Sequence, residues 1–305
     1  MASRLRLKDL QLLLALEQTG SLRAAAEVLN VTQPALTKAL REIEGAFNTT
    51  FFTRSQRGVT PTLQGRVVTR GARIMLQTLD STHREIADVR QRFTSVRLGM
   101  PPFVAHGHFP GLMKVFLQSD PPVSARVVEG AVHDLLERLV SGDLDALITP
   151  YVGAPVPESA CRLVYEPLLE CRYVAIVSNQ HRFARTSVVD LRELVTDRWI
   201  MPSDQSLLRK SLHTAFQLAG VTPPTPVVEV DDPISHINLV AAGIGIGCVA
   251  TSSICSTGAS TVSVLRTRPE IPKTTVAFIF RADDHSDKLE LIKNLVSDYF
   301  SKTRT

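Results

Sequence analysis

The segment from Gly20 to Glu44 constrains the fold most, because it holds two short apolar-periodic runs, neither of which can bury a core alone. In the first run, Leu22 is followed by apolar residues at i+3, i+4 and i+7, the spacing of one helix face. Ser21 is placed to cap this helix, and the pair Asn30-Val31 supplies the turn after it. The leucines between positions 7 and 14 predict a third helix that covers the pair.

The second run predicts a helix with an N-cap at residue 32 and a proline in its first turn, where a missing N–H costs nothing. Its apolar positions, which we expect to be buried, are Leu36, Ala39, Leu40, Ile43 and Phe47. The other side of this helix carries the polar, basic and small positions Thr32, Gln33, Pro34, Thr37, Lys38 and Arg41. Such a helix after a tight turn is typical of a helix-turn-helix, whose last helix enters the major groove of DNA.

The segment that follows, "TTFFTRSQRGVTPTLQG", predicts a two-stranded wing. Phe51 and Phe52 are expected to pack inward, and Gly58 permits a tight turn. Arg54 and Arg57 stand at the tip, where they suit contact with phosphate or the minor groove. The alternative is a three-helix domain whose basic face is merely solvated.

Charge is distributed unevenly along the 305 residues. Residues 1–92 carry 14 basic and 8 acidic residues, a net charge of +6, whereas the remainder has a net charge of −2. A basic N-terminal third attached to a slightly acidic body is expected of a nucleic-acid-binding module joined to a second function.

From Thr62 to Phe93 the apolar spacing of three or four residues predicts one long helix. The stripe consists of Leu63, Val67, Ile74, Met75, Leu79, Ile86, Val89 and Phe93. A helix of this length spans about 45 Å, more than the small domain before it covers. We expect it to pair with the same helix of a second subunit; the alternative is that it lies on its own chain's second domain.

After residue 93 predicted strands and helices alternate, which indicates an α/β fold with parallel sheets and helices on both faces. The roughly 210 residues suit two subdomains, and we expect the chain to cross between them near Val164–Tyr165 and Val264–Leu265. Ligands of such folds bind where strand C-termini meet helix N-termini, in the cleft between the subdomains.

The stretch "GSLRAAAEVLNVTQPALTKALREIEGAFNTTFFTRSQRGVTPTLQG" closely resembles the DNA-binding domain of LysR-type transcriptional regulators. "LVSGDLDALIT" and "VDDPISHINLVAAGIGIG" resemble the effector domain of that family. The resemblance implies a winged helix-turn-helix at 1–61, a linker helix at 62–93 and a periplasmic-binding-protein-like effector domain at 94–305. Subdomain I would comprise about 94–164 and 265–305, and subdomain II about 165–264.

The resemblance also implies the partners and the mode of action. These are a double-stranded DNA operator, a small organic acid or sugar-like effector acting as co-inducer, and a second subunit in a homodimer or homotetramer with antiparallel linker helices. RNA polymerase is a further candidate partner. No metal, other cofactor, signal peptide or membrane partner is expected, and the location is cytoplasmic.

By the same resemblance the effector pocket is lined by Met100, Pro101, Pro102, Thr149, Ser203, Ser206, Asp232, Pro233 and His236. The two serines and the free N–H groups of a helix N-terminus suit a carboxylate. Many relatives have a hydroxyl residue where this chain has Met-Pro-Pro, which weakens that expectation. Each pocket residue has an alternative role as a helix cap or turn residue.

Two further classes of function receive less support. The sequence has no G-x-S-x-G elbow, P-loop or H-E-x-x-H motif, so we do not expect an enzyme. His106 and His108 lack metal-ligand spacing around them and are expected at a helix edge. Cys161 and Cys171 would be a redox pair in a peroxide-sensing member of the family, but only Arg162 and Arg172 are near enough in sequence to activate a thiol.

Overall fold

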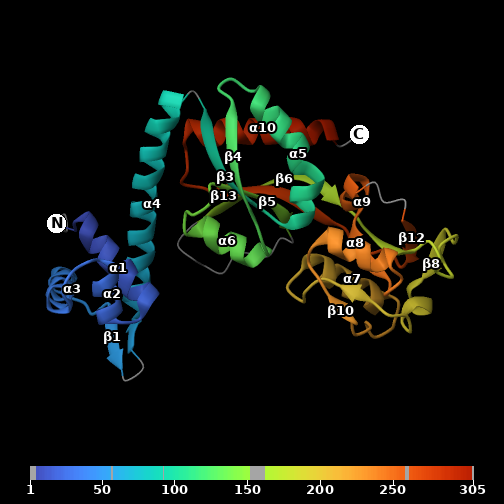
Figure 1. Ribbon diagram of the computed structural model, residues 1–305, viewed down its shortest axis with the longest axis horizontal. Coiled ribbons are helices and arrows are strands. Elements are labelled where there is room, and N and C mark those ends of the chain that lie inside the picture. The colour runs from blue at the N-terminus through green and yellow to red at the C-terminus, as the bar shows by residue number, and fades with distance from the viewer. Residues whose placement is uncertain (1–4, 56–57, 92, 152–161, 258–260, 304–305) are drawn as a thin grey trace. The chain divides into compact units, whose positions relative to one another are not determined.

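The computed structural model describes residues 5–55, 58–91, 93–151, 162–257 and 261–303. The chain folds as two compact units, one built from the residues up to Gln91 together with 141–143, and one built from the other residues that follow (Figure 1). Within the described ranges, no helix has the length and apolar character needed to cross a membrane.

The first unit contains the expected helices and wing. Its elements are α1 (Leu7–Thr19), α2 (Leu22–Val28), α3 (Gln33–Phe47), β1 (Phe52–Ser55), β2 (Gly58–Pro61) and α4 (Leu63–Gln91). Both predicted N-caps are confirmed, because the hydroxyls of Ser21 and Thr32 each accept a hydrogen bond from the N–H three residues later, at 3.4 Å. Asn30, in the turn between α2 and α3, has a positive φ of 52°.

The core of the first unit is apolar and lies where the three helices meet. Leu13, Ala25 and Leu36 are fully buried, and Phe51 and Phe52 pack into the same core as expected. Phe47 was expected on the buried side of α3, but 41% of its surface is exposed. The helix ends there, so Phe47 reaches only the ring of Phe51, at a centroid distance of 5.4 Å.

The wing is anchored to the turn between α1 and α2. The Val59 N–H donates a hydrogen bond of 2.8 Å to the Gly20 carbonyl oxygen. Gly58 has a φ of +120°, and a Cβ there would lie 2.6 Å from that same carbonyl oxygen. Only glycine satisfies both the backbone conformation and the close approach.

Helix α4 packs one side on α1 and exposes an apolar stripe elsewhere. Val68, Ala72 and Leu76 pack into the core of the first unit. The stripe residues Leu63, Val67, Ile74, Met75, Leu79 and Ile86 are exposed, as is Phe93 beyond the helix; the side chain of Val89 lies outside what the structure describes. The α4 stripe, defined as the exposed apolar residues from Leu63 to Ile86, is therefore distinct from the side that meets α1.

The second unit has two main sheets, one in each of its two subdomains, and a short two-stranded parallel sheet. The elements in subdomain I are β3 (Thr94–Met100), α5 (Pro102–Gln118), β4 (Val123–Glu129), α6 (Val132–Val140), β5 (Ala146–Tyr151), β6 (Leu163–Cys171), β13 (Thr274–Arg281) and α10 (Asp287–Thr303). The elements of subdomain II lie between β6 and β13 in the sequence. They are β7 (Tyr173–Ser178), β8 (Val188–Asp190), the 3₁₀-helix η1 (Leu191–Leu194), β9 (Ile200–Met201), α7 (Leu207–Leu218), β10 (Val228–Glu229), α8 (Pro233–Ala241), β11 (Gly247–Ala250), α9 (Thr251–Thr257) and β12 (Val262–Arg268).

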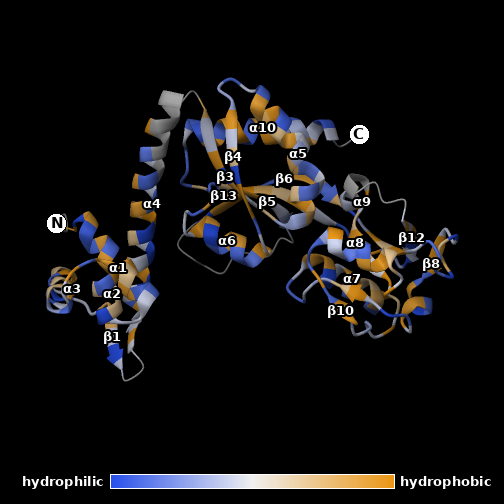
Figure 2. Cartoon of the chain, in the orientation of Figure 1, coloured by the Kyte–Doolittle hydropathy of each residue, from blue (hydrophilic) through white to orange (hydrophobic). Residues whose placement is uncertain are grey.

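The first sheet has the order β4-β3-β5-β13-β6, and its central strands are strongly hydrophobic (Figure 2). Side chains alternate across it. Phe278 of β13 belongs to the cluster that includes Leu112 of α5 and Ile292 of α10, whereas Ile279 belongs to the cluster with Leu139 of α6. Helices α5 and α10 therefore cover one face of the sheet, and α6 covers the other.

The second sheet has the order β11-β7-β12-β8, and it departs from the expected parallel arrangement. Both neighbours of β7 run antiparallel to it, and in the first sheet β13 runs antiparallel to β5 and β6. Strands β6, β8 and β12 were not singled out by periodicity, and β6 and β12 take part in two of the antiparallel pairings. Strands β6 and β12 also carry the chain between the two main sheets.

The chain crosses between the subdomains later than expected. Val164 and Tyr165 are paired with β13 inside β6, and Val264 and Leu265 are paired with β7 inside β12. The crossings therefore lie at Arg172, between β6 and β7, and at residues 269–273, between β12 and β13. Subdomain boundaries at 164/165 and 264/265 would cut through hydrogen-bonded strands.

Candidate functional site

The side of α3 that faces away from the core is solvent-exposed along its first three turns. Gln33, Pro34, Lys38 and Arg41 are exposed, as is the cap Thr32; Thr37 is half-buried. The buried side consists of Leu36, Leu40 and Ile43, which hold the helix against α1 and α2. The first turn of α3 thus presents hydrogen-bonding groups, and the second presents cations.

The wing adds a basic residue to those of α3. Arg54 is exposed on β1, and the hairpin is fixed in register by four residue pairs, including Arg54 with Val59. Arg57 and Gln56 lie outside the described residues. Exposed hydrogen-bonding and cationic groups of this kind on a helix and a hairpin can contact a polyanion and base edges.

A cavity of about 310 Å³ lies between the two sheets of the second unit. Its lining is Pro101, Pro102, Phe103, Gly130, Ala131, Val132, His133, Pro150, Tyr173, Pro202, Ser203, Gln205, Ser206, Leu207, Leu208, Asp231, Pro233, His236, Cys248, Val249, Ala250 and Ser253. The residues before α5 and α6 come from one subdomain, and those before α7 and α8 come from the other. This is the position expected from the strand and helix ends.

Six of the nine residues predicted for the pocket line this cavity: Pro101, Pro102, Ser203, Ser206, Pro233 and His236. Met100 does not, because strand alternation directs it into the core together with Leu98. Thr149 is fully buried within β5, and its neighbour Pro150 lines the cavity instead.

Asp232 is the third predicted residue that does not line the cavity. Its side chain caps α8 by accepting a hydrogen bond of 2.7 Å from the Ser235 N–H. One carboxylate oxygen also lies 3.9 Å from Nδ1 of His106, on α5. The helix-cap role considered from the sequence is therefore the observed one for Asp232.

The preceding residue, Asp231, does line the cavity, and it was missed from the sequence. Its Oδ1 accepts hydrogen bonds from the Ser203 N–H at 2.9 Å and from the Ser203 hydroxyl at 3.0 Å. Ser203 was expected to offer these donors to a carboxylate ligand, but the protein's own carboxylate already occupies them. Ser206 begins α7, and its hydroxyl makes no capping hydrogen bond.

His236 is buried in the wall of the cavity. Burial lowers its pKa to about 4, although backbone hydrogen bonds with Val230 and Ile200 oppose the shift. Its Nε2 is a buried atom without a hydrogen-bond partner in the described chain. The imidazole is therefore neutral at neutral pH, and with its other nitrogen directed at backbone carbonyls, Nε2 is left as an acceptor.

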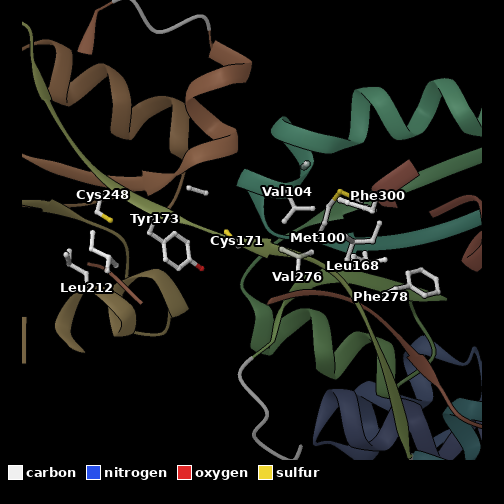
Figure 3. Close-up of a cluster of buried hydrophobic side chains, with 14 of the residues drawn as sticks. Met100, Val104, Leu168, Cys171, Tyr173, Leu212, Cys248, Val276, Phe278 and Phe300 are labelled. Atoms are coloured by element: carbon white, nitrogen blue, oxygen red, sulfur yellow. The ribbon is translucent and has the colours of Figure 1, made fainter. Parts of the chain in front are cut away.

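Tyr173 and Cys171 lie at the first crossing, within one buried hydrophobic cluster that runs through both subdomains (Figure 3). The Tyr173 hydroxyl and the hydroxyl of Thr274, at the second crossing, are joined by a hydrogen bond of 2.8 Å. Burial raises the pKa of Tyr173 well above its usual range, so the phenol stays protonated. This bond ties the two crossing strands together beside the cavity.

The described thiols are poor candidates for peroxide sensing. Burial raises the pKa of Cys171 to about 11, and it raises that of Cys248 as well. Both are free, and a protonated, buried thiol is a weak nucleophile. Cys161 and the side chain of Cys255 lie outside the described residues.

The histidines expected at a helix edge lie instead within α5, in its second turn. His108 is buried against the rings of Tyr299 and Phe300, and burial lowers its pKa. His106 faces Glu129 at 3.8 Å. In the part of the chain that the structure covers, no group of three metal-ligating residues is gathered.

Comparison with known proteins accounts for both units. Residues 7–66 match the family described as "Bacterial regulatory helix-turn-helix protein, lysR family", and residues 90–301 match the "LysR substrate binding domain". The regulator GbpR of Azospirillum brasilense is 28% identical over 241 residues, which cover 78% of this chain and 70% of that protein. The hydrogen peroxide-inducible genes activator of Haemophilus influenzae is 24% identical over 297 residues, which cover 96% and 97%.

The fold agrees with these matches. Full-length OxyR from Pseudomonas aeruginosa, solved as a variant, is similar with a TM-score of 0.66 at 21% identity, over 97% of this chain and 95% of that one. The chain carries the DNA-binding domain and the effector-binding domain of this family in their usual order, and the family consists of regulators rather than enzymes. This protein therefore belongs to the LysR family of transcriptional regulators.

Proposed function

We propose that this regulator reads its operator through the N-terminal half of α3 and the wing. Regulators of the family bind DNA and small-molecule effectors and act as oligomers. Gln33 and Thr37 are assigned to base edges, Thr32 and Pro34 to the helix end near the phosphates, and Lys38, Arg41, Arg54 and Arg57 to the phosphate backbone. The observation that carries the assignment is the exposed, basic side of a helix whose other side is fully committed to the core.

The DNA-binding assignment is tested by the salt dependence of operator binding. A protein that displaces counterions with four cations has a steep, linear fall of log affinity with log salt concentration. Fluorescence anisotropy with the DNA upstream of its own gene is the measurement. Wild type is compared with Lys38→Ala, which should reduce the slope by about one. A slope that is unchanged in this variant would contradict the phosphate role of Lys38.

We also propose that the cavity between the subdomains is the effector site. The six predicted residues that line it, together with Asp231 and Tyr173, support this assignment. A ligand alters operator binding only by preferring one arrangement of the subdomains, so DNA must alter ligand affinity by the same factor. The effector classes implied by the family resemblance are small organic acids and sugar-like molecules.

Blocking the cavity tests the effector site. Ala131 is exposed at the start of α6 and lines the cavity, so Ala131→Trp fills the space without disturbing the core. The variant should keep basal operator affinity and lose any ligand-induced change in it. Lys114→Trp, an exposed position on α5 that does not line the cavity, is the matched control. A full ligand response in Ala131→Trp would place the effector elsewhere.

The oligomer is proposed to form through the α4 stripe, paired with the same stripe of a second subunit in a homodimer or in a homotetramer. A mostly exposed apolar stripe on a 29-residue helix supports a helical partner. We further propose action in the cytoplasm, where the operator lies, and contact with RNA polymerase at the promoter.

A further inference from the structure

We infer that the cavity between the subdomains takes a mainly apolar ligand that carries no carboxylate, and that it disfavours organic acids. This inference rests on the proposed effector role of the cavity and specifies the chemistry of its ligand. Three features of the wall carry it: the lack of a cation, the carboxylate of Asp231, and the apolar lining.

The first feature is that neither Lys nor Arg occurs among the described residues that line the cavity. The cation behind the wall is Arg209 of α7, which is buried and donates a hydrogen bond of 3.1 Å to the carbonyl oxygen of Pro202. Asp204 and Glu229 lie 3.3 and 3.7 Å from its guanidinium. Its charge is thus already balanced by the protein, and a ligand carboxylate would lose its water without gaining a cationic partner.

The second feature is that Asp231 occupies the donors that would otherwise receive an acid. A ligand carboxylate at the Ser203 N–H would have to displace Oδ1 of Asp231 from two hydrogen bonds. It would also lie beside a like charge, which disfavours binding further. This position therefore discriminates against anions actively, rather than merely failing to attract them.

The third feature is an apolar wall. Phe103, Leu207, Leu208 and Val249 line the cavity together with five prolines. Nε2 of His236 is buried and packs against Gly247, where a Cβ would lie 2.6 Å from it, so this nitrogen is not offered to a ligand. The carbon skeleton of a ligand would therefore contact an apolar wall.

The test uses three probes with one carbon skeleton and three charges: benzyl alcohol, benzoate and benzylamine. Ligand-detected NMR titrations of the full chain give the three dissociation constants. We expect benzyl alcohol to bind about tenfold more tightly than benzoate, because the carboxylate is desolvated without a partner. Benzylamine should also bind more tightly than benzoate, because the Asp231 carboxylate attracts its ammonium group instead of repelling it.

Asp231→Asn separates the charge of this residue from its shape. The amide oxygen still accepts from Ser203, so we expect benzoate to bind about fivefold more tightly to the variant, with benzyl alcohol affected less than twofold. Asp298→Asn, an exposed position on α10, is the control and should change neither. The inference is overturned if benzoate binds wild type best, if Asp231→Asn leaves benzoate unchanged, or if benzyl alcohol does not bind at its solubility limit.

Ala131→Trp distinguishes failure of this inference from failure of the proposed site. If the variant loses benzyl alcohol binding, the cavity is the site and the order of the three probes reports its chemistry. If the variant binds every probe as wild type does, the ligands occupy another place, and both the effector site and the inference about its lining are wrong.

Discussion

Arg73 of α4 donates a hydrogen bond of 2.5 Å to Oε2 of Glu17 in α1, while Thr69 donates one of 2.5 Å to Oε1. Both oxygens of the carboxylate are therefore engaged by the linker helix. Thr69 is buried, and Arg73 and Glu17 are largely covered. This arrangement connects the helix that carries the α4 stripe to the helix that supports the recognition helix.

Glu17→Ala should lower the free energy of unfolding of the first unit by about 1–3 kcal/mol, because it leaves two donors without their acceptor. Chemical denaturation followed by circular dichroism measures the change. The sole tryptophan, Trp199, lies in the second unit, so its fluorescence transition should stay in place. Arg66→Ala, an exposed position on the same helix, is the control; an equal loss there would show that the effect is not specific to the pair.

Gln33→Ala and Arg54→Ala should affect DNA binding in different ways. Removing the Gln33 amide should cost about 1–3 kcal/mol of discrimination at one base pair, because it removes a contact to a base edge. Removing Arg54 should weaken operator and non-specific DNA alike and flatten the salt dependence. Affinity for the operator, for single-base variants of it and for random DNA separates the two; uniform weakening by Gln33→Ala would refute its role in reading bases.

The double variant Ile74→Glu and Ile86→Glu should dissociate the oligomer, since it would bury two unpaired charges in a helical interface. Sedimentation velocity reports the assembly state. Arg66→Glu with Arg70→Glu places two carboxylates on the same helix outside the α4 stripe, and it should sediment as wild type does. If the isoleucine variant also sediments unchanged, the α4 stripe is not the subunit interface.

His236 should make the second unit less stable in acid. Its pKa is about 4 in the folded chain and about 6.5 when unfolded, so the unfolded state binds the additional proton between these values. The contribution of His236 to the free energy of unfolding is complete above about pH 6.5. It is lost as pH falls toward 4, by up to about 3 kcal/mol. Denaturation monitored by Trp199 fluorescence at several pH values should show a shallower pH slope for His236→Gln; an identical slope would exclude His236 as the source.

Local signals in the sequence were sufficient for the first unit. The caps at Ser21 and Thr32, the buried leucines of α3 and the glycine of the wing depend on residues close along the chain, and the structure confirms each. Phe47 is the exception, because its burial depends on where α3 ends relative to the wing. The matches to two families then bear out the identification that these residues suggested.

The cavity was only partly predictable. Residues at helix starts, such as Pro101 and Pro233, were named from the family resemblance, and they line the cavity, where strand and helix ends converge. Which of two adjacent residues faces the cavity depends on strand register and helix capping, so Pro150 and Asp231 line it where Thr149 and Asp232 were expected. The sequence Asp231-Asp232-Pro233 indicated the start of a helix, but it did not indicate which of the two aspartates caps that helix.

The sequence by itself determined the class of protein, the helices and caps of the first unit and the α4 stripe, because periodicity and caps act over a few residues. Tertiary structure alone decided the antiparallel strands, the crossings at Arg172 and 269–273, and the chemistry of the cavity. The contact between Asp231 and Ser203 joins residues 28 positions apart. Such contacts arise from sheet pairing and packing between distant segments, to which no local pattern in the chain corresponds.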